Sequence, residues 1–284
     1  MSPLEALNSI TMAFDEDEIV SLSWKEVPKQ FEWQVTVIFS TEPNSEYWQQ
    51  YLTKYCRVLG LATPEMTVTK VEEKNWLTEN AKLFAPFTVG RFYVHSSEYE
   101  GNTPKDTLPL VIGAATAFGS GHHETTQGCL SILDKLPREP YAKKPYHLLD
   151  MGTGSGILGI AAAKIWDHLA VTAVDCDPEA IRVCVENVER NGVGDSVRVF
   201  VSDRVLLKGV RGYDIIVANI LAQPLLDLAS QFYGALCSQG FLILSGLLNE
   251  QSQSIIQKYI PMGLTMCEHH TKGEWSTLLL KKIS

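Results

Sequence analysis

The sequence predicts an α/β fold in two parts, a small α+β unit followed by a larger unit built on a mostly parallel sheet. The 284 residues are enough for about two domains. The first third combines strand-like segments with one helical segment, whereas the remainder alternates short apolar runs with longer helical segments, as βαβ units do. We place the small unit at residues 1–71, a polar connecting segment at 72–83 and the larger unit at 84–284.

The elements of the small unit follow from their periodicity. Residues 31–39 (FEWQVTVIF) alternate apolar and polar side chains, which predicts a half-buried strand. After the turn-forming residues 41–44, apolar side chains recur at helical spacing over residues 48–59. Residues 66–73 (MTVTKVEE) predict another strand, and residues 19–24 (IVSLSW) predict one more.

The elements of the larger unit alternate in type. Apolar runs that predict strands lie at 146–151, 170–174, 197–201, 214–219, 241–246 and 276–282. Segments with helical spacing lie at 157–166, 178–191, 223–237 and 249–259. Connections of this kind favour parallel strands joined through helices.

Composition excludes several classes of protein. The apolar fraction is 45% and the charged fraction 20%, as in soluble globular chains. No apolar run approaches the roughly 18 residues that a membrane span needs, and the N-terminus does not resemble a secretory signal. The six cysteines include no C-x-x-C pair, which argues against a zinc site. We therefore expect reduced thiols, a cytoplasmic protein, no metal and no membrane association.

The net charge of −9 is unevenly distributed. Residues 1–82 carry 7 basic and 13 acidic side chains, whereas residues 83–284 carry 17 and 20. Proteins that bind duplex nucleic acid usually present a basic surface, because phosphate contacts dominate their affinity. We therefore expect no direct nucleic-acid binding, and an acidic N-terminal third suits a basic protein partner.

A glycine-rich turn is the sharpest local feature. In residues 146–164 (YHLLDMGTGSGILGIAAAK) an apolar strand ends at Asp150, and Gly152, Gly154 and Gly156 lead into a helix. Glycines let a ligand approach the backbone, and the helix N-terminus offers unpaired N–H groups. Ligands of doubly wound sheets bind at the carboxyl ends of such strands.

This turn alone allows two kinds of cofactor. Residues 154–159 also satisfy the dinucleotide pattern G-x-G-x-x-G, and Asp175, about 20 positions on, suits a ribose in either case. Three details favour S-adenosylmethionine. Asp150 suits the α-amino group of that cofactor, whereas it would repel the pyrophosphate of a dinucleotide. Asp203 follows the third strand, where the adenine of the cofactor would lie. Asn219 follows the fourth strand, at the same end of the sheet. A nicotinamide-dependent oxidoreductase and a non-catalytic cofactor-binding module remain as alternatives.

Six segments of the sequence belong together: AFGSGHHETT (117–126), LLDMGTGSGILGIAA (148–162), VDCDPEAI (174–181), NVERNGV (187–193), VANILAQPL (217–225) and GEWSTLLL (273–280). In this order they resemble the PrmA family, the methyltransferases of ribosomal protein eleven of the large subunit. The combination of the first with VANIL is much more specific than the glycine turn. The resemblance covers residues 75–284, whereas the N-terminal third is similar only in size and pattern.

The resemblance implies a ferredoxin-like substrate-recognition domain, a linker and a Rossmann-like, seven-stranded methyltransferase domain. It implies methyl transfer to lysine side chains and the N-terminal amine of that ribosomal protein. The implied contacts with the cofactor are Thr126, Gly152, Asp175 and Asn219, with Phe118 and Gly119 lining the same pocket. Two residues of the upstream loop, Ser120 and Glu124, depart from the family's usual Thr and Pro.

The acceptor side of the site is a hypothesis of its own. Methyl transfer from a sulfonium needs alignment and an unprotonated amine. We expect Asn219 to accept hydrogen bonds from the incoming amine and Trp275 to wall the acceptor slot, and we expect a monomer. His122 and His123 are expected to hold their loop rather than a metal. The alternative substrate is another protein, such as an electron-transfer flavoprotein subunit.

Overall fold

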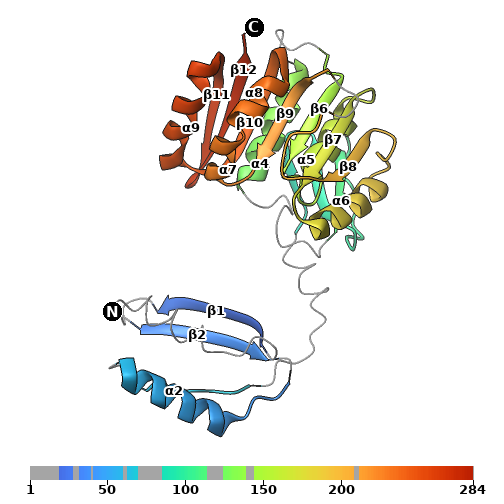
Figure 1. Ribbon diagram of the computed structural model, residues 1–284. Helices are drawn as coiled ribbons and strands as arrows, with labels where there is room; N and C mark the ends of the chain where they lie inside the picture. Colours follow the sequence, from blue (N-terminus) through green and yellow to red (C-terminus); the bar gives the residue numbers. More distant parts are fainter. Residues whose placement is uncertain are drawn as a thin grey trace. The chain divides into compact units, whose positions relative to one another are not determined.

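The computed structural model describes residues 19–27, 32–39, 41–59, 63–69, 85–113, 124–138, 144–207 and 211–283 (Figure 1). The chain divides into two compact units, residues 1–74 and 75–284. None of the helices in the described ranges is long and apolar enough to cross a membrane.

The first unit pairs a hairpin with one helix. Strands β1 (Ile19–Val27) and β2 (Glu32–Phe39) are antiparallel, and helix α2 spans Ser45–Leu59. Asn44 caps this helix, because its Oδ1 accepts a hydrogen bond from the Tyr47 amide at 3.1 Å. The ring centroids of Phe39 and Trp48 lie 5.3 Å apart. This contact packs the helix against the hairpin, and the two elements lie side by side in Figure 1. Two of the three predicted strands and the predicted helix are confirmed.

The third strand predicted for this unit is wrong where it can be checked. Met66–Thr69 form no strand, and residues 70–73 lie outside the described residues. Within the described part of the chain, β1 and β2 pair only with each other. A short alternating segment needs a partner strand to satisfy its backbone, and these residues have none in that sheet. The predicted connecting segment, 72–83, also lies outside the described residues.

The second unit is built on a seven-stranded sheet of order β11-β12-β10-β9-β6-β7-β8. Its strands are β6 (His147–Met151), β7 (Ala170–Asp175), β8 (Val197–Val201), β9 (Tyr213–Asn219), β10 (Leu236–Leu248), β11 (Leu264–Lys272) and β12 (Trp275–Lys282). Strands β8, β7, β6, β9 and β10 are parallel, and β12 is antiparallel to both of its neighbours. The expected mixed α/β fold is confirmed.

Helices cover both faces of this sheet (Figure 1). One core contains side chains of α4 (Glu124–Lys135), α5 (Ile157–Ile165) and α6 (Pro178–Arg190); the other contains side chains of α7 (Ala222–Asp227), α8 (Ala229–Ala235) and α9 (Ser252–Tyr259). Short 3-10 segments lie at Leu136–Arg138, Asn249–Gln251 and Ile260–Met262. Because successive strand residues face opposite sides, Leu148 belongs to the first core and Leu149 to the second.

A small sheet of β3 (Phe87–Val89), β4 (Phe92–Ser96) and β5 (Leu108–Ile112) packs against the first core. Neither this sheet nor α4 nor β11 was predicted as an element from the sequence. The helix predicted at 223–237 is divided into α7 and α8, and it ends at Ala235 rather than at Cys237. The chain turns into β10 there because Leu236 pairs with Tyr213 on β9.

Gly128 provides a test of how α4 packs on the sheet. A Cβ at this position would lie 2.2 Å from the Thr277 Oγ1 atom and 3.0 Å from the Thr277 Cβ atom on β12. Thr277 is buried, and its hydroxyl is 2.8 Å from the Ser245 hydroxyl, so it has little room to move. We expect Gly128→Ala to lower the free energy of unfolding by about 1–3 kcal/mol, measured by urea denaturation.

Gly234 in α8 is the matched control. A Cβ there would meet no atom within 4 Å. We expect Gly234→Ala to raise the free energy of unfolding by about 0.5–1 kcal/mol, because alanine has the higher helix propensity. Equal stabilisation by both substitutions would show that α4 does not contact β12 as described.

Candidate cofactor and acceptor site

The carboxyl edge of the parallel strands gathers most of the predicted site residues. The glycine turn follows β6, Asp175 ends β7 and Asn219 ends β9. Because β12 runs antiparallel to β10, its first residue, Trp275, pairs with Leu248 at that same edge. The fold therefore brings these residues to the same end of the strands.

The glycine turn adopts a backbone that favours glycine. Gly152, Gly154 and Gly156 have φ of 70°, 52° and 82°. The Gly152 amide donates to the Val174 carbonyl at 2.8 Å, which joins the turn to β7. A Cβ at Gly152 would lie 2.2 Å from the Ile220 side chain, whereas a Cβ at Gly154 would meet no protein atom within 4 Å. Thus Gly152 is needed for packing, and Gly154 borders open space.

Asp150 lies beneath this turn and holds it closed. Its Oδ2 atom accepts hydrogen bonds from the Thr153 hydroxyl at 2.7 Å and the Gly159 amide at 2.9 Å. The residue is 1% exposed, and burial raises the pKa of its carboxyl to about 6, although these two hydrogen bonds favour the charged form. The nearby charge of Asp175 raises the pKa further.

Asp175 joins the end of β7 to the glycine turn. Its Oδ2 atom accepts a hydrogen bond from the Gly154 amide at 2.9 Å, and its Oδ1 atom accepts one from the Asp177 amide at 3.1 Å. The backbone carbonyl of Asp175 accepts a bond from the Ser202 amide after β8. Its carboxylate therefore lies directly beside Gly154, the part of the turn that borders open space.

Asn219 and Thr126 form a second group. The Asn219 Nδ2 atom donates to the Thr126 hydroxyl at 3.2 Å, and Thr126 is buried in the first turn of α4. The Asn219 Oδ1 atom is buried and has no hydrogen-bond partner in the part of the chain that the structure describes. A buried carbonyl without a partner costs about 1–3 kcal/mol, so this atom is suited to a ligand that donates a hydrogen bond.

A network of polar side chains lies at the start of β12, next to Trp275 in the sequence. The Ser276 hydroxyl donates to Asn249 Oδ1 at 2.8 Å, and Ser245 donates to the Ser276 carbonyl at 2.9 Å. Ser245 pairs in register with Asn219, and both Ser245 and Ser276 are fully buried. The network therefore connects the start of β12 with the strand end that carries Asn219. Trp275 itself is half-buried.

Among the other predicted site residues, those that the structure describes form no hydrogen bond or ion pair with the glycine turn, Asp175 or Asn219. Asp203 follows β8, but its side chain is 73% exposed and pairs with the adjacent Arg204 at 3.3 Å. Phe118 and Gly119 lie outside the described residues, as do His122 and His123. Among the residues that the structure does describe, no three His, Cys, Asp or Glu side chains gather to form a metal site.

Two contacts of the glycine turn were not predicted from the sequence. Thr153 bonds to Asp150 within the turn, and the Asn187 side chain on α6 donates to the Ser155 carbonyl at 2.9 Å. Asn187 begins the segment NVERNGV, whose resemblance to the PrmA family was the available signal. Its contact joins residues 32 positions apart, which spacing along the chain does not reveal.

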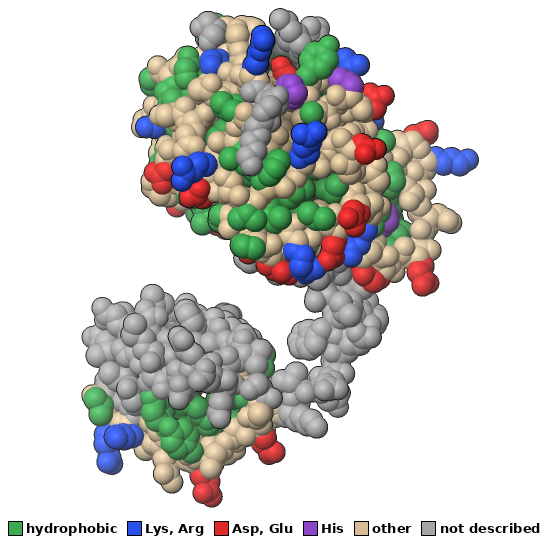
Figure 2. Space-filling view, turned by 45° about the vertical axis from the view of Figure 1, so that its right-hand side comes forward, with side chains coloured by type: hydrophobic (Ala, Val, Ile, Leu, Met, Phe, Trp, Pro, Cys, Tyr) green, Lys and Arg blue, Asp and Glu red, His purple; other side chains and the backbone are tan. Residues whose placement is uncertain are grey.

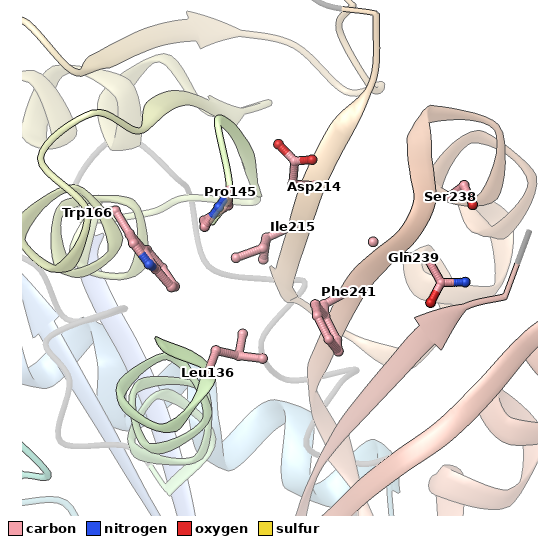
Figure 3. A pocket seen from close by; sticks show the side chains of 9 residues that line it. Leu136, Pro145, Trp166, Asp214, Ile215, Ser238, Gln239 and Phe241 are labelled. Atoms are coloured by element: carbon pink, nitrogen blue, oxygen red, sulfur yellow. The ribbon is translucent and has the colours of Figure 1, made fainter. Parts of the chain in front are cut away.

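A small pocket lies at the opposite, amino edge of the sheet (Figure 3). Leu136, Trp166 and Phe241 contribute apolar side chains to its lining, and Asp214 contributes a carboxylate. That carboxylate already accepts hydrogen bonds from the amides of Tyr146 and His147, at 2.8 and 3.0 Å. This pocket is separated by the length of the strands from the glycine turn and therefore belongs to a different part of the fold.

Comparison with known proteins gives a consistent result. The family model described as "Ribosomal protein L11 methyltransferase (PrmA)" matches residues 4–283. The ribosomal protein L11 methyltransferase of Bradyrhizobium diazoefficiens is 39% identical over 261 residues, covering 89% of this chain and 84% of that protein. That of Rhodopseudomonas palustris is 34% identical, covering 95% and 90%.

A solved structure supports the same relationship. The crystal structure of a ribosomal protein L11 methylase from Lactobacillus delbrueckii is 29% identical, with a TM-score of 0.62, and covers 71% of this chain and 100% of that one. The sequence match extends over nearly the whole chain, and the similar structure shares the mixed α/β fold over the 71% of this chain that it covers. The chain belongs to the PrmA family of ribosomal protein L11 methyltransferases.

Proposed function

We propose that this methyltransferase binds S-adenosylmethionine at the carboxyl edge of the sheet. It would transfer the methyl group to lysine side-chain amines, and to the N-terminal amine, of ribosomal protein L11. The observation that carries the proposal is the buried, unpartnered Oδ1 atom of Asn219 at the edge that also holds the glycine turn. The curated relatives named for this activity support the choice of substrate.

The residues at the edge fit S-adenosylmethionine. Open space beside Gly154 admits the ligand close to the backbone, and Asp175 next to it offers carboxylate oxygens to ribose hydroxyls. Asp150 places a negative charge next to the glycine turn, which favours binding of the cationic amino group of S-adenosylmethionine. Gly152, Phe118, Gly119, Thr126 and Asp203 complete the proposed contacts, with Asp203 beside the adenine.

The acceptor slot must favour a neutral amine. S-adenosylmethionine supplies an electrophilic methyl group and leaves as a neutral thioether. A lysine amine has a pKa of about 10.4, so deprotonation near pH 7.4 costs about 4 kcal/mol. A partly desolvated slot lowers this cost, because burial disfavours the ammonium. We assign the Asn219 Oδ1 atom to accept an N–H of the amine and Trp275 to wall the slot.

The first unit is proposed to select the protein substrate, with a ferredoxin-like fold and an acidic surface that suits a basic partner. On the face of the larger unit seen in Figure 2, acidic and basic side chains are interspersed, which suits a protein that does not bind nucleic acid directly. We propose a cytoplasmic monomer whose parts are residues 1–71, 72–83 and 84–284.

Intact-mass spectrometry of unmethylated ribosomal protein L11 tests this function. Incubation with the protein and S-adenosylmethionine is expected to add whole methyl increments, which peptide mapping places on lysines and the N-terminus.

Asn219→Ala is expected to lower turnover about a hundred-fold through misalignment of the amine, with unchanged thermal unfolding. Gln257→Ala, an exposed amide on α9, serves as the control with wild-type turnover. Methylation of a different protein alone, such as an electron-transfer flavoprotein subunit, would reject the proposed substrate.

Asp175→Ala tests the seat of the cofactor. Loss of charge-assisted hydrogen bonds, each worth about 1.5–3 kcal/mol, is expected to raise the Kd for S-adenosylmethionine at least about ten-fold by calorimetry. Asp167→Ala removes a fully exposed carboxylate that precedes β7 at the other edge, and its Kd should equal that of the wild type. Unchanged affinity in Asp175→Ala would reject this seat.

The pKa of Asp150 gives a prediction for pH. A bound cationic amino group favours the carboxylate, so affinity is fully present above the free-state pKa of about 6 and is lost as the pH falls through it. The Kd for S-adenosylmethionine is expected to rise about ten-fold between pH 7 and pH 5. In Asp150→Asn this rise should disappear; an identical rise in that variant would assign the pH dependence to another group.

A further inference from the structure

The C-terminal end of α6 presents two asparagines to β5: Asn187 in the last turn of the helix and Asn191 at its C-cap. The Asn191 side chain accepts a hydrogen bond from the Val111 amide at 3.0 Å and donates to the Val111 carbonyl at 2.7 Å. The Asn187 side chain accepts a hydrogen bond from the Gly113 amide at 3.0 Å. The two side chains therefore bond to the backbone of Val111 on β5 and of Gly113 directly after it.

Only one of the two asparagines also reaches the glycine turn. The Asn187 Nδ2 atom donates to the Ser155 carbonyl at 2.9 Å, whereas the Asn191 Nδ2 atom donates to the Asn187 carbonyl at 2.8 Å. Asn187 is 0% exposed, so water does not compete for these bonds. Its Oδ1 atom also accepts a bond from the Arg190 guanidinium at 3.0 Å. Asn187 thus links α6, the end of β5 and the glycine turn.

The Ser155 carbonyl belongs to the peptide that carries the Gly156 amide. A peptide group is planar, so fixing the carbonyl also fixes the direction of that N–H. The Gly156 amide closes the turn by donating to the Thr153 carbonyl at 2.9 Å, and Gly156 has φ of 82°. Gly156 is also the residue that caps α5, with no side-chain hydrogen bond at that cap. The side-chain amide of Asn187 therefore sets the geometry of the glycine turn where α5 begins.

We propose that Asn187 is a positioning residue for cofactor binding. Its side-chain amide holds the Ser155–Gly156 peptide and the end of β5 in the arrangement that receives S-adenosylmethionine. This inference rests on the proposed function. A seat held in its binding geometry before the ligand arrives loses less entropy on binding, so the effect of Asn187 falls on affinity for the cofactor. The methyl-transfer step at saturating cofactor does not depend on it.

The substitution Asn187→Asp separates the hydrogen bond that the side chain donates from the two that it accepts. The Gly113 amide and the Arg190 guanidinium both donate to the Oδ1 position and favour an ionised carboxylate, so the link to β5 is kept. The donor to the Ser155 carbonyl is lost and is replaced by an oxygen that repels it. Asn191→Asp is the matched control, because it makes the same change one turn away without touching the glycine turn.

The measurements are the Kd for S-adenosylmethionine by calorimetry, steady-state methylation of ribosomal protein L11 and urea denaturation. We expect Asn187→Asp to raise the Kd about ten-fold, with kcat at saturating cofactor and the KM for the protein substrate within about two-fold of wild type. Asn191→Asp is expected to lower the midpoint of denaturation as much as Asn187→Asp does, with a wild-type Kd.

The other outcomes of these measurements would contradict the positioning role of Asn187. Equal Kd values for the two variants would overturn the positioning role, as would a loss of kcat in Asn187→Asp without a change in Kd. If Asn187→Asp does not fold, Asn187→Ala is compared with Asn191→Ala in the same way. Failure of both Asn187 variants to fold, with both Asn191 variants folded, would make Asn187 a folding residue only. If wild-type protein does not bind S-adenosylmethionine, the proposed function fails, independently of Asn187.

Discussion

The Asp150 carboxylate connects the two sides of the glycine turn, and the rest of the site depends on this interaction. One of its oxygen atoms receives both the Thr153 hydroxyl and the Gly159 amide, so the end of β6 and the first turn of α5 are held together. The carboxylate is removed from water, which raises its pKa. The fold therefore maintains a costly buried carboxylate where the chain passes from β6 into the glycine turn.

The remaining site residues take their places relative to this turn through the sheet. Hydrogen bonds from Gly152 to β7, and from Gly154 to the Asp175 carboxylate, fix the turn against the second strand. Parallel pairing of β6 with β9 brings Asn219 to the same edge. The reversed direction of β12 adds Trp275. Strand order and direction thus bring Asp175 and Asn219 to the same end of the parallel strands, where we propose the cofactor and the acceptor amine to bind.

Local pattern predicted much of this arrangement, and the unpredicted parts are non-local. The glycine turn and strand ends follow from short segments whose apolar runs, glycines and acidic residues lie next to each other. Strand β11 was missed because it is a polar edge strand, whose pairing with β12 decides its structure. The predicted helix at 223–237 was too long because the pairing of Leu236 with β9 overrides helical spacing. The buried state of the Asn219 Oδ1 atom and the Asn187 contact with Ser155 depend on packing between distant segments.

A crystal structure of the protein with S-adenosylhomocysteine and a lysine-containing peptide of ribosomal protein L11 would test where the cofactor and the acceptor amine bind. We expect ribose hydroxyls on the Asp175 carboxylate, the thioether sulfur facing the lysine amine, and an N–H of that amine on the Asn219 Oδ1 atom. A nucleoside bound in the pocket at the amino edge of the sheet, or an Asn219 carbonyl turned away from the amine, would contradict this expectation.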